Sequence, residues 1–163
     1  MITHIFGASD RVIHCILGIL TSKQVYKTYI KLPTAETPLA DKIQSSKHYY
    51  PFFKDCLGAL DGTHILTHTP EPVRAAYQDR KGQISQNILV VCSMDMRFLY
   101  LLSGWEGSAS DSQVYNDARS SDFHVPDGKY YLADSGYGTC GALLVPYQCI
   151  HYHLKEWGKS VEW

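Results

Sequence analysis

The feature that most constrains the fold is an acidic residue in the middle of an apolar run. Residues Cys56 to Leu66 have the composition of a buried strand, and Asp61 lies at its centre. A lone carboxylate in apolar surroundings costs several kcal/mol unless it is paired or binds a cation. The fold is therefore expected to bring a partner for Asp61 to this strand. Asp61-Gly62 is also a hairpin-turn signal, which would leave two very short strands instead.

Composition bounds the class of protein. The chain has 163 residues, of which 45% are hydrophobic and 19% charged, which is typical of one soluble globular domain. Its 15 basic and 16 acidic residues give a net charge of −1, so any contact with nucleic acid must be local. Five scattered cysteines without a C-x-x-C motif indicate a reducing compartment, and no apolar segment is long enough to suggest membrane association.

Hydrophobic periodicity predicts an α/β chain. A strand at 84–94 and a returning strand at 98–105, joined by the short turn 95–97, form a three-stranded antiparallel meander with the first strand. Further strands are expected at 129–134 and within 143–154. Helices are expected at 9–29, around 40–45 and at 112–120.

Two further acids stand out beside Asp61. Asp111 lies in a Gly/Ser loop at a helix start, and Asp134 follows the fourth strand. If that strand pairs with the first, Asp61 and Asp134 emerge on adjacent strands and share a metal ion. Mg²⁺ and Mn²⁺ prefer such oxygen ligands, and two such ions promote phosphodiester cleavage.

Simpler roles remain open for these residues. Asp111 is also suited to cap the following helix, and Asp134 to serve as an ordinary turn residue. Three basic residues near the expected site suit contacts to DNA phosphates or, equally, are solvated turn charges; they are Arg74, Arg80 and Lys81.

Other sites receive less support from the sequence. His64 and His68 share a face only on a helix, whereas strand is predicted there, so a zinc pair is disfavoured. His151, His153 and Cys149 alternate along a segment, but a closed zinc site needs a fourth ligand. The aromatic residues at 49–53 are expected to pack in the core rather than to stack on bases.

Four linked segments resemble the successive motifs of PIF/Harbinger-type transposases of the DDE endonuclease superfamily. The order of the segments matches, and so does the spacing, with 50 residues from Asp61 to Asp111 and 23 from Asp111 to Asp134. The similarity covers nearly the whole chain. The segments are Leu57–Ile65, Arg80–Asn87, Gly104–Ser112 and Tyr131–Tyr137.

The resemblance implies an RNase H-like mixed sheet with flanking helices. It also implies a DNA endonuclease or transposase acting on transposon ends with Mg²⁺ or Mn²⁺. Asp61, Asp111 and Asp134 would be the metal positions, with Asp61 and Asp134 the first two acids of the triad and Asp111 an accessory acid or an alternative second member. The same resemblance implies a Myb-like companion protein and a nuclear location. Apart from the resemblance, the expected location is cytoplasmic.

The family pattern also includes a glutamate on a downstream helix, and no matching segment occurs before Trp163. Glu156 and Glu162 stand in unlike surroundings. We therefore expect residues 1–50 to be a remnant of the preceding region and 51–163 to be a partial endonuclease domain that lacks the C-terminal catalytic helix. Weak or absent cleavage is expected; the alternative is a domesticated, non-catalytic module that binds DNA or protein.

Overall fold

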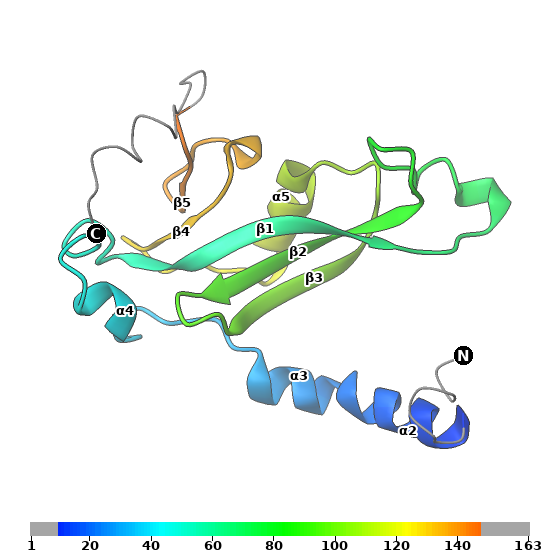
Figure 1. Cartoon of the computed structure of the whole chain (residues 1–163), viewed down its shortest axis with the longest axis horizontal. Coiled ribbons are helices and arrows are strands. Elements are labelled where there is room, and N and C mark those ends of the chain that lie inside the picture. The colour runs from blue at the N-terminus through cyan, green and yellow to red at the C-terminus, as the bar shows by residue number, and fades with distance from the viewer. Residues whose placement is uncertain (1–9, 148–163) are drawn as a thin grey trace, which may run out of the picture.

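The computed structural model describes residues 10–147, and its centre is a mixed sheet of five strands (Figure 1). The strand order is β3-β2-β1-β4-β5, so the predicted meander with two added strands is confirmed. In chain order the elements are α2 (Asp10–Leu20), α3 (Lys23–Tyr29), α4 (Asp41–Gln44), β1 (Cys56–Leu66), the 3-10 helix η1 (Glu71–Val73), β2 (Ser85–Ser93), β3 (Phe98–Glu106), α5 (Asp111–Ser121), β4 (Tyr130–Leu132), the 3-10 helix η2 (Ser135–Tyr137) and β5 (Leu143–Leu144).

The strand β1 runs unbroken through the acidic position. Asp61 is the register partner of Val90, and Gly62 is the partner of Leu89, in the antiparallel pairing of β1 with β2. The alternative of a hairpin turn at Asp61-Gly62 is therefore wrong. The turn lies instead between β2 and β3, where Met96 adopts a positive φ of 61°.

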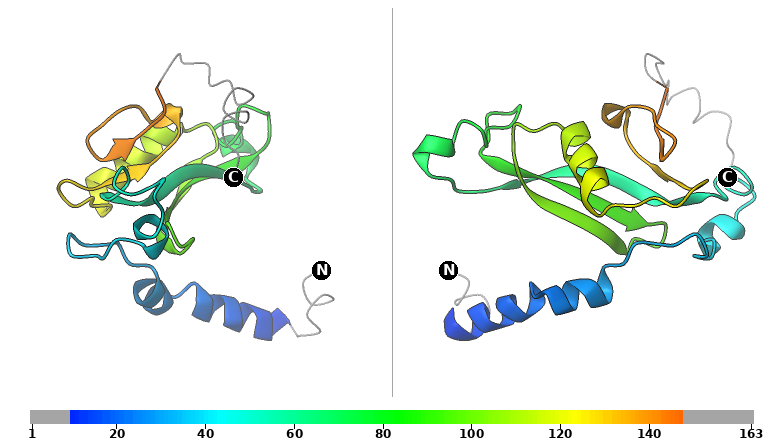
Figure 2. Two further views of the ribbon diagram at one scale, coloured as in Figure 1. Left: turned by 60° about the vertical axis from the view of Figure 1, so that its left-hand side comes forward. Right: turned by 180° about the vertical axis from the view of Figure 1, so that it is seen from behind.

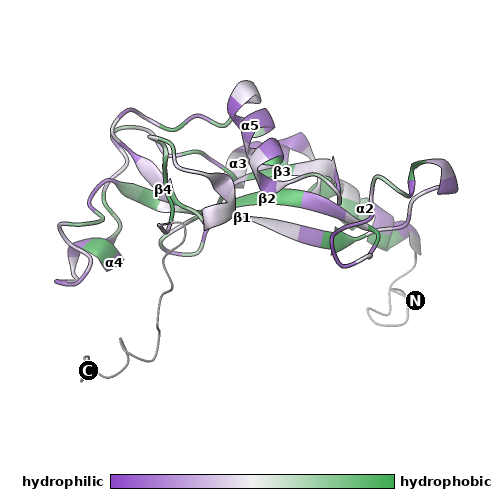
Figure 3. Cartoon of the chain, turned by 90° about the horizontal axis from the view of Figure 1, so that it is seen from above, coloured by the Kyte–Doolittle hydropathy of each residue, from purple (hydrophilic) through white to green (hydrophobic). Residues whose placement is uncertain are grey.

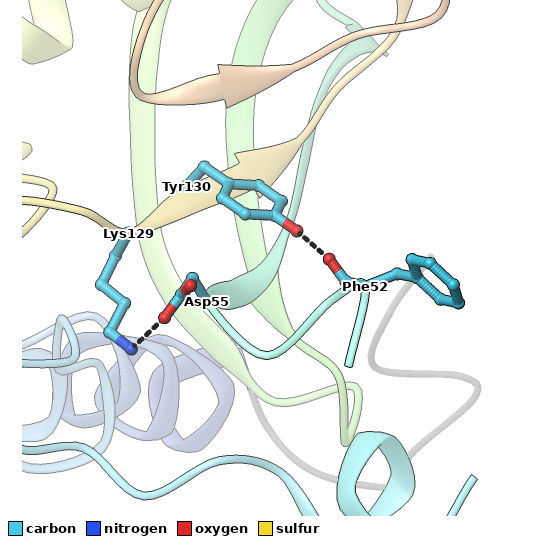
Figure 4. Close-up of polar contacts among 4 residues, drawn as sticks. All are labelled: Phe52, Asp55, Lys129 and Tyr130. Atoms are coloured by element: carbon cyan, nitrogen blue, oxygen red, sulfur yellow. Dashed lines mark hydrogen bonds and ion pairs between the residues drawn. The ribbon is translucent and has the colours of Figure 1, made fainter. Parts of the chain in front are cut away.

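A parallel pairing joins β4 to β1 and is anchored at its start (Figure 4). The Lys129 ammonium contacts the Asp55 carboxylate at 3.0 Å. The Tyr130 hydroxyl donates to the carbonyl of Phe52 at 3.1 Å, and the Tyr130 N–H donates to the carbonyl of Asp55 at 3.2 Å. These three contacts fix where β4 begins relative to β1, and hence which residues lie side by side further along.

The helix α5 covers one face of the sheet (Figure 2). It is largely hydrophilic on its outer side (Figure 3), and only a narrow stripe is buried, formed by Val114, Tyr115 and Ala118. These positions lie three and four residues apart, which is the spacing of one helical face. The helix therefore packs on the sheet through one narrow face, and its first turn is free to contribute to a site.

Aromatic packing forms the centre of the core. Phe123 is fully buried, and its ring centroid lies 5.0 Å from that of Tyr100, 5.6 Å from that of Tyr131 and 6.1 Å from that of Tyr115. The three tyrosines come from β3, β4 and α5. One side chain thus connects the meander, the added strand and the covering helix.

The N-terminal part differs from the prediction. A single helix over 9–29 is wrong within the described residues, because α2 ends at Leu20 and Ser22 caps a new helix with its hydroxyl accepting from the Val25 N–H at 3.4 Å. Ser9 lies outside the described residues. Both helices lie alongside the sheet (Figure 1), and the Tyr26 hydroxyl donates to the Leu101 carbonyl at 3.4 Å. The predicted domain division at residue 50 stays a prediction.

The aromatic cluster before β1 also departs from expectation. Tyr49 and Tyr50 are about half exposed, and Phe52 is 75% exposed, so these residues do not form core. They lie in turns ahead of β1. Between residues 10 and 147 the model contains no helix with the length and apolar character of a membrane span.

Replacing Phe123 by Ala is expected to lower the free energy of unfolding by about 3–5 kcal/mol, because it leaves a cavity among three packed rings. Urea denaturation measures this change. Phe52→Ala is the matched control, and its exposed ring predicts a change within about 0.5 kcal/mol. Equal losses in the two variants would contradict the assignment of Phe123 to the centre of the core.

Candidate functional site

The pairing of β1 with β4 sets Asp61 and Asp134 at corresponding positions. Ala59 pairs with Leu132, and each acid lies two residues further along its own segment. Asp134 begins η2, and its carboxylate accepts from the Gly136 N–H at 2.9 Å. The turn role left open for Asp134 is therefore confirmed, and it holds the carboxylate at the end of β4.

The third acid reaches β1 from the start of α5. The helix is capped by Ser110, not Asp111, in a capping box with Gln113, so the capping role considered for Asp111 is wrong. The Asp111 carboxylate instead accepts from the Asn87 side chain at 2.8 Å and lies against Gly62. Asn87 is buried on β2 and also donates to the Ala109 carbonyl at 3.0 Å.

Gly62 leaves the space that the Asp111 carboxylate occupies. A Cβ at this position would overlap Asp111 Oδ1 and lie 2.6 Å from its Cγ. Asn87 Oδ1 would be 3.3 Å away, and this oxygen is buried without a hydrogen-bond partner among the described residues. The close approach of Asp111 to β1 thus requires glycine for steric reasons.

A hydrogen bond joins the two segments that carry Asp111 and Asp134. The Ser112 hydroxyl donates to the Gly136 carbonyl at 2.6 Å, which ties the first turn of α5 to η2. Backbone register, a buried amide and this bond therefore bring the three segments that carry the acids to the same part of the sheet.

The three acids affect each other electrostatically. Partial loss of solvent raises the pKa of Asp61 above its ordinary value, against the lowering effect of the Gly62 N–H, and the negative charges of Asp134 and Asp111 raise it further. Burial, followed by the charges of Asp111, Asp61 and Asp134, also raises the pKa of Tyr137. The Tyr137 hydroxyl is buried and has no hydrogen-bond partner among the described residues.

The donor set suits a divalent cation of the Mg²⁺ or Mn²⁺ type, because it offers carboxylate oxygens that repel one another. Side chains alternate along a strand, so Gly62 shares the face of Leu60 while Asp61 points to the other face. Consistent with this, no three His, Cys, Asp or Glu side chains in the described range are grouped closely enough to hold a metal ion together. The convergence of all three acids on one ion stays a prediction.

A polar cavity of about 410 Å³ opens beside Asp111. We call it the Asp111 cavity. Arg80 and Lys81 line it, whereas Arg74 forms an exposed ion pair with Glu71 at 3.0 Å and lines a different cavity. Of the three predicted basic contacts, the structure therefore brings two to the cavity beside Asp111 and leaves one apart.

The histidine alternatives are resolved in part. His64 lies on β1 and lines the Asp111 cavity, while His68 lies beyond the end of β1 in the other cavity, so they do not form the zinc pair considered above. Cys149, His151 and His153 lie outside the described residues, as do Glu156 and Glu162.

Sequence reasoning missed the two residues that position Asp111. Asn87 is a polar residue on a strand whose other residues are mostly apolar, which is the same kind of signal that singled out Asp61. Gly62 gave no signal of its own, because its role depends on a residue far along the chain that packs against it.

A mixed sheet that carries acids on its central strands and at the start of the covering helix defines a nuclease-like α/β class. Comparison with known proteins agrees with this class. The family model described as DDE superfamily endonuclease matches residues 60–160, and the chain belongs to this family, with its RNase H-like fold.

Similar proteins include "Protein ALP1-like" of Arabidopsis thaliana, which is 32% identical over 129 residues covering 66% of this chain. The "Putative nuclease HARBI1" of Rattus norvegicus is 32% identical over 93 residues, and that of Mus musculus is 30% identical over 93 residues, each match covering 55% of this chain. The chain spans 31% of the length of the first relative and 27% of each of the other two. No solved structure matches it.

Replacing Gly62 by Ala is expected to lower the free energy of unfolding by about 1–3 kcal/mol, because the added methyl group displaces the Asp111 carboxylate from Asn87. Urea denaturation measures the loss. Adding Asp111→Ala to this variant makes room for the methyl group, so the double variant is expected to lose less than the sum of the single changes. Gly141→Ala, which faces open space, is the control; additive losses would contradict the contact.

Asp61→Asn is expected to stabilise the metal-free protein at neutral pH. Since the folded state raises the pKa of Asp61, the associated stability is fully present below the ordinary value of 3.8 and is lost as the pH rises through the raised value. The asparagine variant escapes that loss, so its advantage in urea unfolding with EDTA should grow from acidic to neutral pH. Asp127→Asn, in an exposed loop, should show no such trend.

Proposed function

We propose that the chain is a DNA-cleaving domain of the DDE type that depends on a divalent cation. The observation that carries the proposal is that the segments bearing Asp61, Asp134 and Asp111 meet at the same part of the sheet, where desolvation, and after it the charges of Asp134 and Asp111, raise the pKa of Asp61. Membership of the DDE endonuclease family supports the same reaction class.

In this proposal Asp61 and Asp134 hold the cation and Asp111 assists from the start of α5. A bound Mg²⁺ or Mn²⁺ supplies an activated water or hydroxyl and stabilises the leaving oxygen of a phosphodiester. Asn87 orients the Asp111 carboxylate through the bond at 2.8 Å. The Tyr137 hydroxyl is protonated at neutral pH, and burial followed by the charges of the acids raises its pKa further, so it remains a hydrogen-bond donor in alkaline solution as well.

Duplex DNA is the proposed substrate, with transposon ends as its natural form. Arg80 and Lys81 support this assignment because they place positive charge in the cavity beside Asp111, where they suit sequence-independent contacts to phosphates. A Myb-like companion protein and a nuclear location are proposed on the family resemblance alone.

Purified chain is expected to nick supercoiled plasmid slowly in Mg²⁺ or Mn²⁺ and not in EDTA. Asp61→Asn and Asp134→Asn should each lower nicking at least about 100-fold, since each removes a ligand charge, while Asp127→Asn should not. Agarose gels of the nicked product measure the rate. Nicking that survives both site variants would refute the proposal, and DNA binding without any nicking would favour the non-catalytic module.

A further inference from the structure

A chain of side-chain hydrogen bonds lies beside the acids and takes no part in holding them. His64 Nδ1 lies 3.0 Å from the Ser85 hydroxyl, which in turn donates to Asp79 Oδ2 at 3.3 Å. A hydroxyl has one proton, and here it goes to Asp79, so His64 Nδ1 must be the donor to Ser85. The tautomer of His64 is thereby fixed.

The other ring nitrogen of His64 is left for a ligand. Nε2 has no hydrogen-bond partner among residues 10–147, and the side chain lines the Asp111 cavity. Ser85 holds the ring in place because Ser85 is fully buried and Gly107 packs against its hydroxyl. A Cβ at position 107 would lie only 2.5 Å from that hydroxyl, so no larger residue fits there.

Asp79 links this histidine to the basic turn of the cavity. Its Oδ1 accepts hydrogen bonds from the N–H groups of Lys81 at 2.8 Å and Gln83 at 2.9 Å, while its Oδ2 accepts one from the Ser85 hydroxyl. The Gln83 N–H, against slight desolvation, lowers the pKa of Asp79, and Lys81, Ser85 and His64 lower it further. One carboxylate therefore sets the positions of Lys81 and His64 together.

Two other readings of the same residues are disfavoured. A hydrolytic triad requires the histidine between the serine and the acid, whereas here Ser85 lies between them and is fully buried. A metal site at His64 is disfavoured because, between residues 10 and 147, no three His, Cys, Asp or Glu side chains are grouped closely enough to hold an ion. The cavity offers two basic residues, hydroxyl groups and a fixed imidazole, which suit a phosphate. Its lining also includes the carboxylates of Asp111 and of Asp79, and Asp79 already accepts three hydrogen bonds.

We propose that His64, together with Arg80 and Lys81, binds a backbone phosphate of DNA in the Asp111 cavity. This rests on the proposed function and names a positioning residue for the substrate. His64 contacts a non-bridging phosphate oxygen through Nε2 and holds the strand beside Asp111. The contact reads no base, so it contributes equally to all sequences.

The test is binding of two short labelled DNA duplexes of unrelated sequence, measured by fluorescence anisotropy in EDTA so that no divalent cation takes part. His64→Ala should weaken both complexes about fivefold. His64→Asn keeps a donor for Ser85 but has no atom at the position of Nε2, so it should be as weak as the alanine variant. His64→Gln, which places an amide near that position, should restore most of the affinity.

Ser85→Ala should give an intermediate loss, because it frees the ring to rotate. His124→Ala, an exposed histidine in the loop before β4, is the matched control and should bind as the unaltered chain does. Wild-type affinity in His64→Asn, a loss confined to one duplex, or no DNA binding by the unaltered chain would each overturn the proposal. Because this test omits metal, it can fail while plasmid nicking by the unaltered chain persists, and the reverse also holds.

Discussion

The parallel pairing of β1 with β4 is the constraint on which the rest of the structure depends. Without it, nothing would bring the segment that carries Asp134 to the strand that carries Asp61, whose position is exposed rather than buried among apolar residues as the sequence predicted. Three contacts at the start of β4, two from Tyr130 and one from Lys129, fix the register. That register sets Asp134 at the position on its segment that corresponds to Asp61 on β1, and the bond from Ser112 to Gly136 then brings in α5.

The arrangement stores electrostatic repulsion where chemistry is proposed. Desolvation, and after it the charges of Asp134 and Asp111, raise the pKa of Asp61. Burial, and after it the charges of all three acids, raises the pKa of Tyr137, whose buried hydroxyl has no partner among the described residues. A sequence selected only for stability would remove such charges. Their presence beside Gly62, which leaves space for the Asp111 carboxylate, is consistent with a site that a cation completes.

Much of the sheet could be predicted because strand periodicity and a short turn are local signals. The candidate acids could be picked out from the same patterns, since Asp61 stood out against its apolar neighbours in the sequence. The break at Ser22 was missed because the apolar spacing continues across it, and a single hydroxyl cap decides the boundary. The exposure of Phe52 could not be predicted, because burial depends on what covers a segment and not on its composition.

The contacts that position Asp111 are a second feature that could not be predicted from the sequence. Its neighbours Gly62 and Asn87 lie 49 and 24 residues earlier in the chain, on two different strands. The separation of Arg74 from Arg80 and Lys81 likewise depends on how the segment between β1 and β2 folds back. Pairwise proximity of this kind arises from tertiary packing, and no local pattern encodes it.

The long sequence separation across the β1 and β4 pair has a consequence for folding. Cys56 and Tyr130 are register partners, whereas the hairpin of β2 and β3 closes across a few residues. Loop-closure entropy favours the local hairpin first and delays the distant pairing. During synthesis the chain is therefore expected to carry a formed meander before Asp134 has left the ribosome, so that the segments bearing Asp61 and Asp134 come together only in the last stage of folding.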